Sequence, residues 1–69
     1  MRGTVLDWRR DWGFITPDDS SRHAFVHFTD IISPEDNGFR ILHTGQIVDF
    51  DIEQTSRGPR ARNVRILFN

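Results

Sequence analysis

The chain has 69 residues, of which 36% are hydrophobic and 28% are charged, and its formal net charge is −1. This length allows one small domain and excludes a second, and the absence of cysteine excludes disulfides and thiolate zinc sites. No stretch is long and apolar enough to span a membrane, and residues 1–8 lack the apolar run of a secretory signal. We therefore expect one soluble, cytoplasmic domain over residues 1–69.

The N-terminal half is predicted to form three short strands separated by turns. Residues 2–8 and 12–16 are expected to be the first two strands, and residues 22–27 the third. The intervening segments, 9–11 and 17–21, are rich in residues that favour turns. Strands connected in this way form a meander.

A longer connection and two more strands follow. The connection covers residues 29–44 and includes a loop by composition at 33–38. Residues 47–53 then alternate apolar with acidic side chains, which predicts a strand. Its inward-facing residues are expected to be Val48, Phe50 and Ile52.

The last predicted strand carries Val64, Ile66 and Phe68 on one side. Arg62 has the same parity as these apolar residues. It must therefore lie near a sheet end, extend its charged group to solvent, or mark a β-bulge.

The order of these elements predicts an all-β fold, a five-stranded antiparallel Greek-key barrel of the oligonucleotide-binding (OB) type. Closure solves a physical problem, because so small an open sheet would leave two unpaired edges and one apolar face in water.

Aromatic side chains alternate along the second and third predicted strands. Trp12 and Phe14 point to one side of the second strand, and Phe25 and His27 to one side of the third. The opposite sides carry aliphatic residues such as Ile15, which are better core material for a small sheet. If the strands pair, four rings share one surface that remains available to a ligand.

Charge is unevenly distributed along the chain. Residues 1–53 contain five arginines and all ten acidic residues, whereas residues 54–69 contain four arginines and no acid. All nine basic residues are arginine, whose forked donors suit phosphate and whose planar group stacks on bases. An ordinary solvated surface, or a genome composition that favours arginine, would give the same pattern.

Several ordered motifs resemble the cold-shock domain along essentially the whole chain. The motifs are Gly3-Thr4-Val5, Trp12-Gly13-Phe14-Ile15-Thr16-Pro17, Phe25-Val26-His27-Phe28, the run from Gly45 to Glu53 and the run from Arg57 to Val64. The resemblance implies a barrel that binds single-stranded RNA or DNA on its aromatic face, typically as an RNA chaperone that keeps transcripts unpaired. It places base-stacking positions at Trp12, Phe14, Phe25, His27 and Phe28, with Phe39 as the aromatic of the long loop.

The chain departs from the family pattern at the first hairpin. The loop between the first two strands is shorter than usual, so Trp8 matches either the exposed tryptophan of the first strand or the aromatic that follows it. The family's Lys-Gly is replaced by Arg10-Asp11. We expect Asp11 to supply the positive φ of this turn, which aspartate tolerates better than most residues.

The predicted function is therefore single-stranded nucleic-acid binding with low sequence specificity and tolerance of pyrimidines, by a monomer without cofactor or metal. Stacking would be supplemented by arginine contacts to phosphates. The predicted binding residues are Trp8, Arg10, Trp12, Phe14, Phe25, His27, Phe28, Phe39, Arg40, Arg57 and Arg60.

Two other functions compete with this one. An OB-fold module could use the same aromatic face to bind a protein, which Asp7, Asp11 and the acidic balance of residues 1–53 would suit. Ribonuclease chemistry is not expected, because His23 and His27 on one strand would lie about 13 Å apart. The chain also lacks a glycine-rich phosphate loop, a nucleophile elbow and a metal-spaced set of ligands.

Overall fold

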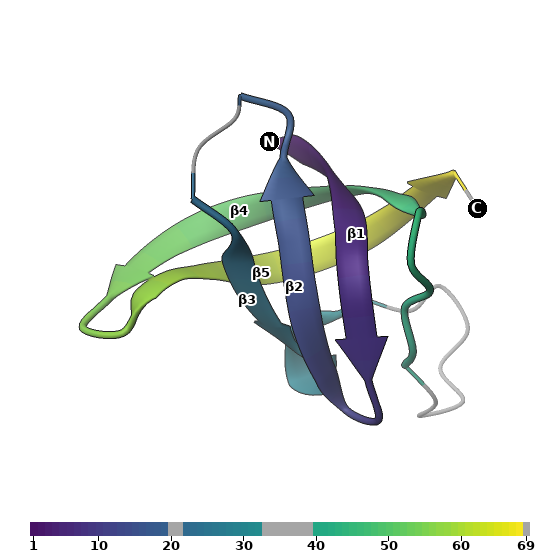
Figure 1. The fold of residues 1–69 in the computed structure, drawn as a ribbon, viewed down its shortest axis with the longest axis horizontal. Helices are drawn as coiled ribbons and strands as arrows, with labels where there is room; N and C mark the ends of the chain where they lie inside the picture. The colour runs from purple at the N-terminus through teal and green to yellow at the C-terminus, as the bar shows by residue number, and fades with distance from the viewer. Residues whose placement is uncertain (20–21, 33–39, 69) are drawn as a thin grey trace.

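The computed structural model describes residues 1–19, 22–32 and 40–68. The elements within these ranges are β1 (Arg2–Arg9), β2 (Trp12–Pro17), β3 (Ala24–His27), the 3₁₀ helix η1 (Phe28–Asp30), β4 (Ile47–Thr55) and β5 (Gly58–Phe68). The strands close into a barrel in the order β1-β2-β3-β5-β4 (Figure 1). Neighbouring strands are antiparallel except β3 and β5, which are parallel. The predicted fold class, an OB-type barrel, is confirmed.

Strand boundaries differ from the prediction mainly in the third and fourth strands. β3 begins at Ala24, so Arg22 and His23 lie outside the strand that was expected to start at Arg22. β4 continues to Thr55 and pairs there with Gly58 of β5. The resulting β4–β5 hairpin projects from the barrel (Figure 1).

The barrel interior is filled by aliphatic side chains and one phenylalanine. Val48 and Phe50 of β4 are buried as predicted, and Ile52 packs against the core while remaining partly exposed. Burying a residue as large as Phe50 contributes about 1.5–3 kcal/mol. The buried apolar residues are Val5, Ile15, Ala24, Val26, Ile31, Leu42, Val48, Phe50, Ala61 and Val64.

The three apolar residues at the end of β5 differ in their exposure to solvent. Val64 is buried, but Ile66 and Phe68 are 41% and 62% exposed. These two residues lie at the C-terminal end of β5. Ile66 is opposite Val48 and Phe68 is opposite Ile47 at the start of β4, with a second register shift between the two pairs. Residues 65–68 are all exposed, although Ile66 lies opposite the buried Val48, so pairing with a core residue does not bury this end of the strand.

A β-bulge explains Arg62. Asp49 pairs with Arg65 whereas Asp51 pairs with Arg62, so three steps along β5 oppose two along β4. Asn63, within the extra step, has a φ of 54°. The bulge reverses the parity of β5, so that Arg62 faces solvent. Of the three positions left open for Arg62, the bulge is the one observed.

Candidate nucleic-acid interface

The pairing of β2 with β3 brings the predicted aromatic residues together. Phe14 lies opposite Phe25, and Trp12 lies opposite His27. The ring centroids of Trp12, Phe14 and Phe25 are 5.8–6.0 Å from one another. Phe28, the first residue of η1, has its ring centroid 4.7 Å from that of His27. We call Trp12, Phe14, Phe25, His27 and Phe28 the aromatic surface.

These five side chains are half-buried, whereas their strand neighbours on the inner face are fully buried. Ile15 and Val26 are 0% exposed. Phe14 meets Trp12 and Phe25 edge to face, with interplanar angles of 84° and 75°. Such edge contacts hold the rings in place while leaving part of each ring in solvent. Trp12, Phe14 and Phe25 therefore keep part of each ring accessible on the outer face of the barrel.

His27 has one ring nitrogen engaged within the chain. The backbone N–H of Thr29 donates to Nδ1 of His27 at 3.4 Å, and the Thr29 hydroxyl oxygen lies 2.9 Å from the same nitrogen. This contact caps the start of η1. In the neutral ring an accepting Nδ1 leaves the hydrogen on Nε2. Nε2–H is then the donor that His27 can offer to a ligand.

Trp8 lies apart from the aromatic surface. It pairs with Gly13, whose side of β2 faces the interior, and it packs against the core. Its indole nitrogen is buried and has no hydrogen-bond partner among the described residues. Of the two family positions that Trp8 could match, this placement favours the aromatic that follows the exposed tryptophan of the first strand. Trp8 is itself half-buried, and its part in binding stays a prediction.

Arg9 is next to the aromatic surface, although it is not among the binding residues predicted from the sequence. Its guanidinium lies 5.4 Å from the centroid of the Trp12 ring, and its Nε is 3.7 Å from a carboxylate oxygen of Asp7. Arg9 lies opposite Trp12 and Asp7 opposite Phe14, and the register shifts only beyond Asp7, toward Val5. Counting outward from a two-residue turn at Arg10-Asp11 would have identified the Arg9–Trp12 pair.

The turn between β1 and β2 differs from expectation in one detail. Arg10, and not Asp11, has the positive φ, at 52°. Arg10 is exposed at the tip of this hairpin, beside the strand end that carries Trp12.

The other predicted cations are not all gathered at the aromatic surface. Arg60 lies beside Phe25 in the parallel β3–β5 pair. Arg57 is exposed in the turn of the projecting β4–β5 hairpin. Arg40 is half-buried, and its Nε has no hydrogen-bond partner in the described part of the chain. Phe39 lies outside the described residues.

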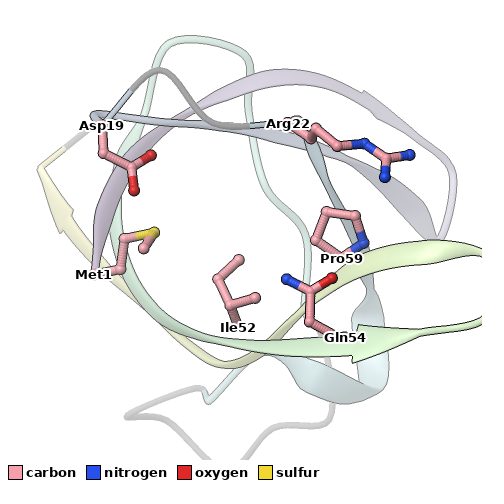
Figure 2. Close-up of a pocket in the computed structure, with 6 residues that line it drawn as sticks. All are labelled: Met1, Asp19, Arg22, Ile52, Gln54 and Pro59. Atoms are coloured by element: carbon pink, nitrogen blue, oxygen red, sulfur yellow. The ribbon is translucent and has the colours of Figure 1, made fainter.

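A separate hollow of about 240 Å³ lies between the β2–β3 connection and β4–β5 (Figure 2). It is lined by Met1, Asp19, Arg22, Ile52, Gln54 and Pro59. Figure 2 shows the Arg22 guanidinium directed along the rim and away from the centre. The hollow shares no residue with the aromatic surface.

Within residues 1–19, 22–32 and 40–68, no group of three or more histidine, aspartate or glutamate side chains is arranged to hold a metal ion. No helix in them is long and apolar enough to cross a membrane.

An OB barrel with aromatic rings on the outer face of its second and third strands defines a small nucleic-acid-binding domain. The sequence model of the 'Cold-shock' DNA-binding domain matches residues 1–67. The chain belongs to the cold-shock domain family, whose members bind single-stranded nucleic acids. The resemblance drawn from the motifs is thus confirmed.

Curated relatives support the same assignment over nearly the full length. The chain is 48% identical to the cold shock-like protein of Aquifex aeolicus, over 97% of this chain and 94% of that protein. It is 54% identical to the cold shock-like protein CspG of Escherichia coli, over 93% and 90%. It is 40% identical to the probable cold shock protein A of Mycolicibacterium smegmatis, over 96% and 97%.

Proposed function

We propose that this protein binds single-stranded RNA or DNA by stacking bases on the aromatic surface, and that it acts in the cytoplasm as a monomeric RNA chaperone. The observation that carries the proposal is the packing of Trp12, Phe14 and Phe25, which holds three rings half-exposed on the outer face of β2 and β3. Rings held in this way present flat faces to a ligand without prior rearrangement.

Stacking accounts for binding with low sequence specificity. Every base has a π-face, and each stacked base contributes about 1–3 kcal/mol. Duplexes hide their bases and should bind poorly. Arg9, Arg10 and Arg60 lie at or beside the aromatic surface and are the proposed phosphate contacts. Few cationic contacts imply a shallow dependence of affinity on salt.

The test is a titration with oligothymidylate or oligouridylate, followed by tryptophan fluorescence and by anisotropy of a labelled strand. Stacking on Trp12 should quench its emission. In Trp12→Phe the quench should be lost while anisotropy still reports binding, and in the matched Trp8→Phe variant the quench should remain. No binding by either readout at tens of micromolar protein would contradict the proposal.

A protein-binding role for the same surface has one observation in its favour. Asp7 lies opposite Phe14 on the outer face, where its carboxylate would repel a phosphate. Asp7→Asn distinguishes the two ligands. The variant should bind oligothymidylate more tightly if the surface holds an anionic strand, whereas a basic protein partner would bind it more weakly.

A further inference from the structure

A buried carboxylate joins two arginines at the edge of the aromatic surface. Asp30, the last residue of η1, has a side chain that is only 5% exposed. Its Oδ2 accepts from Nε of Arg60 at 2.9 Å, and its Oδ1 lies 2.9 Å from Nε of Arg62. Each carboxylate oxygen therefore faces a different guanidinium.

The backbone explains why these three residues meet. The two arginines are two positions apart on β5, so they point to the same side of the strand. η1 continues from β3 along β5, and the backbone N–H of Ile32 donates to the carbonyl oxygen of Val64 at 2.8 Å. This path sets Asp30 against the outer side of β5. A buried carboxylate is tolerated there because both its oxygens are paired.

The two arginines differ in which of their guanidinium nitrogens remain available to a ligand. Nη1 of Arg62 donates to both carboxylate oxygens of Glu53, at 3.2 and 3.3 Å. Arg60 is paired through Nε alone, and its Nη groups have no hydrogen-bond partner among the described residues. Arg60 is also the β5 residue that lies beside Phe25. One guanidinium is thus held at its inner edge and open at its outer edge, next to a ring of the aromatic surface.

We propose that Asp30 is a positioning residue, which fixes the Arg60 guanidinium so that its Nη groups bind one phosphate of the strand whose base stacks on Phe25. This inference rests on the proposed function. Holding the arginine before the ligand arrives lowers the entropy lost on binding, because a free arginine side chain would have to be ordered at that moment.

The expected effect of neutralising Asp30 on affinity is opposite to the effect expected from its charge alone. Asp30 is negative, so its neutralisation should strengthen binding of an anionic strand if charge were its only influence. Positioning predicts that neutralisation weakens binding. Glu53→Gln is the matched control, because it removes a carboxylate that contacts Arg62 and leaves the Asp30–Arg60 pair in place.

The experiment measures Kd for labelled hexathymidylate by anisotropy in four variants, Asp30→Asn, Arg60→Ala, the double variant and Glu53→Gln. We expect Asp30→Asn to weaken binding about fivefold, and to have no further effect once Arg60 is alanine. Glu53→Gln should bind as tightly as the wild type or more tightly. Unchanged or tighter binding by Asp30→Asn, or an equal loss in the Arg60→Ala background, would overturn the proposal.

Thermal unfolding of each variant shows whether it is folded. Should Asp30→Asn fail to fold, Arg60→Lys replaces it, because lysine keeps the charge but has no Nε–H for Asp30 and no planar fork. The proposal expects Arg60→Lys to lose as much affinity as Arg60→Ala, and wild-type affinity for Arg60→Lys would overturn it.

A scan with neutral methylphosphonate linkages identifies the phosphate. Replacing one linkage of hexathymidylate at a time should give one position at which the wild type loses affinity and Arg60→Ala does not. No such position would overturn the assignment of a phosphate to Arg60. If the wild type binds no oligonucleotide at all, the proposed function itself fails. If the wild type binds and Asp30→Asn has the same affinity, only this inference is refuted.

Discussion

The guanidinium of Arg9 lies 5.4 Å from the centroid of the Trp12 ring, across the first two strands of the barrel. A cation over an indole face is stabilised by the ring quadrupole by about 0.5–1 kcal/mol at exposed sites. One face of Trp12 is therefore already in contact with a positive group, and a base stacked on the indole would have that group close to its phosphate.

We predict that Arg9→Ala weakens binding of oligothymidylate and reduces the slope of log K against log salt by about 0.7, the value for one phosphate contact on a single strand. The measurement is a titration at several salt concentrations. Arg65→Ala is the control, because Arg65 is exposed beside Asp49 of β4, outside the aromatic surface. Equal slopes for the wild type and Arg9→Ala would contradict a phosphate contact by Arg9.

Removing one ring of the aromatic surface should separate binding from folding. Phe14→Ala or Phe25→Ala should lower affinity for a single strand more than tenfold, because each stacked base contributes about 1–3 kcal/mol. Circular dichroism should show that both variants keep the β fold. Phe68→Ala removes a ring that is 62% exposed at the end of β5, and its affinity should be unchanged. Unfolding of the Phe14 and Phe25 variants, or unaltered affinity, would show that these rings serve the core or are irrelevant to binding.

Among the four glycines in the described part of the chain, Gly13 should be the least tolerant of substitution for steric reasons. A β-carbon there would overlap the carbonyl oxygen of Asp7 and lie 3.0 Å from Trp8. Gly13→Ala should therefore force β1 and β2 apart and abolish or severely reduce stability. Gly45→Ala is the matched control, since no described residue other than its chain neighbours has an atom within 4 Å of the new methyl group, and its cost is limited to the φ of +95°. The roughly 1–2 kcal/mol expected for that φ should lower the midpoint of thermal unfolding without loss of the fold. Similar midpoints for both variants would contradict this distinction.

Arg10 holds a strained position in the β1–β2 turn. Its φ of 52° is typical of glycine at the first central position of a two-residue hairpin loop. Arg10→Gly should raise the free energy of unfolding by about 1 kcal/mol, measured by urea denaturation. Arg57→Gly, in the turn of the other hairpin, controls for the loss of an arginine at a position where φ is not positive. A decrease in stability for Arg10→Gly would contradict the strain.

Alternation was sufficient to predict much of the fold and the centre of the candidate site. The buried Ile15 and Val26, on the reverse of Trp12 and Phe25, follow directly from the two-residue period of a strand. Features that depend on register could not be predicted in this way. The bulge between Val5 and Asp7 is one such feature, because it lets Val5 pair with Ile15 while Asp7 pairs with Phe14.

Long-range pairing accounts for the remaining differences. Asp30 was not selected from the sequence because its partners are 30 and 32 positions further along the chain, on a strand that only the barrel closure brings alongside. The exposure of Ile66 and Phe68 could not be predicted either, since local alternation does not reveal which end of a strand remains in solvent.

Asn63, with its φ of 54°, determines whether Arg60 and Arg62 of β5 face the solvent or the barrel interior. Ala61 and Val64 both point inward although they are three positions apart, an arrangement that the extra residue at 63 makes possible. Deleting one residue here would turn the preceding part of β5 over, bringing Arg60 and Arg62 into the apolar interior and Ala61 out to water. Natural variation at this point of the chain should therefore consist of replacements, preferably by asparagine or glycine, and not of changes in length.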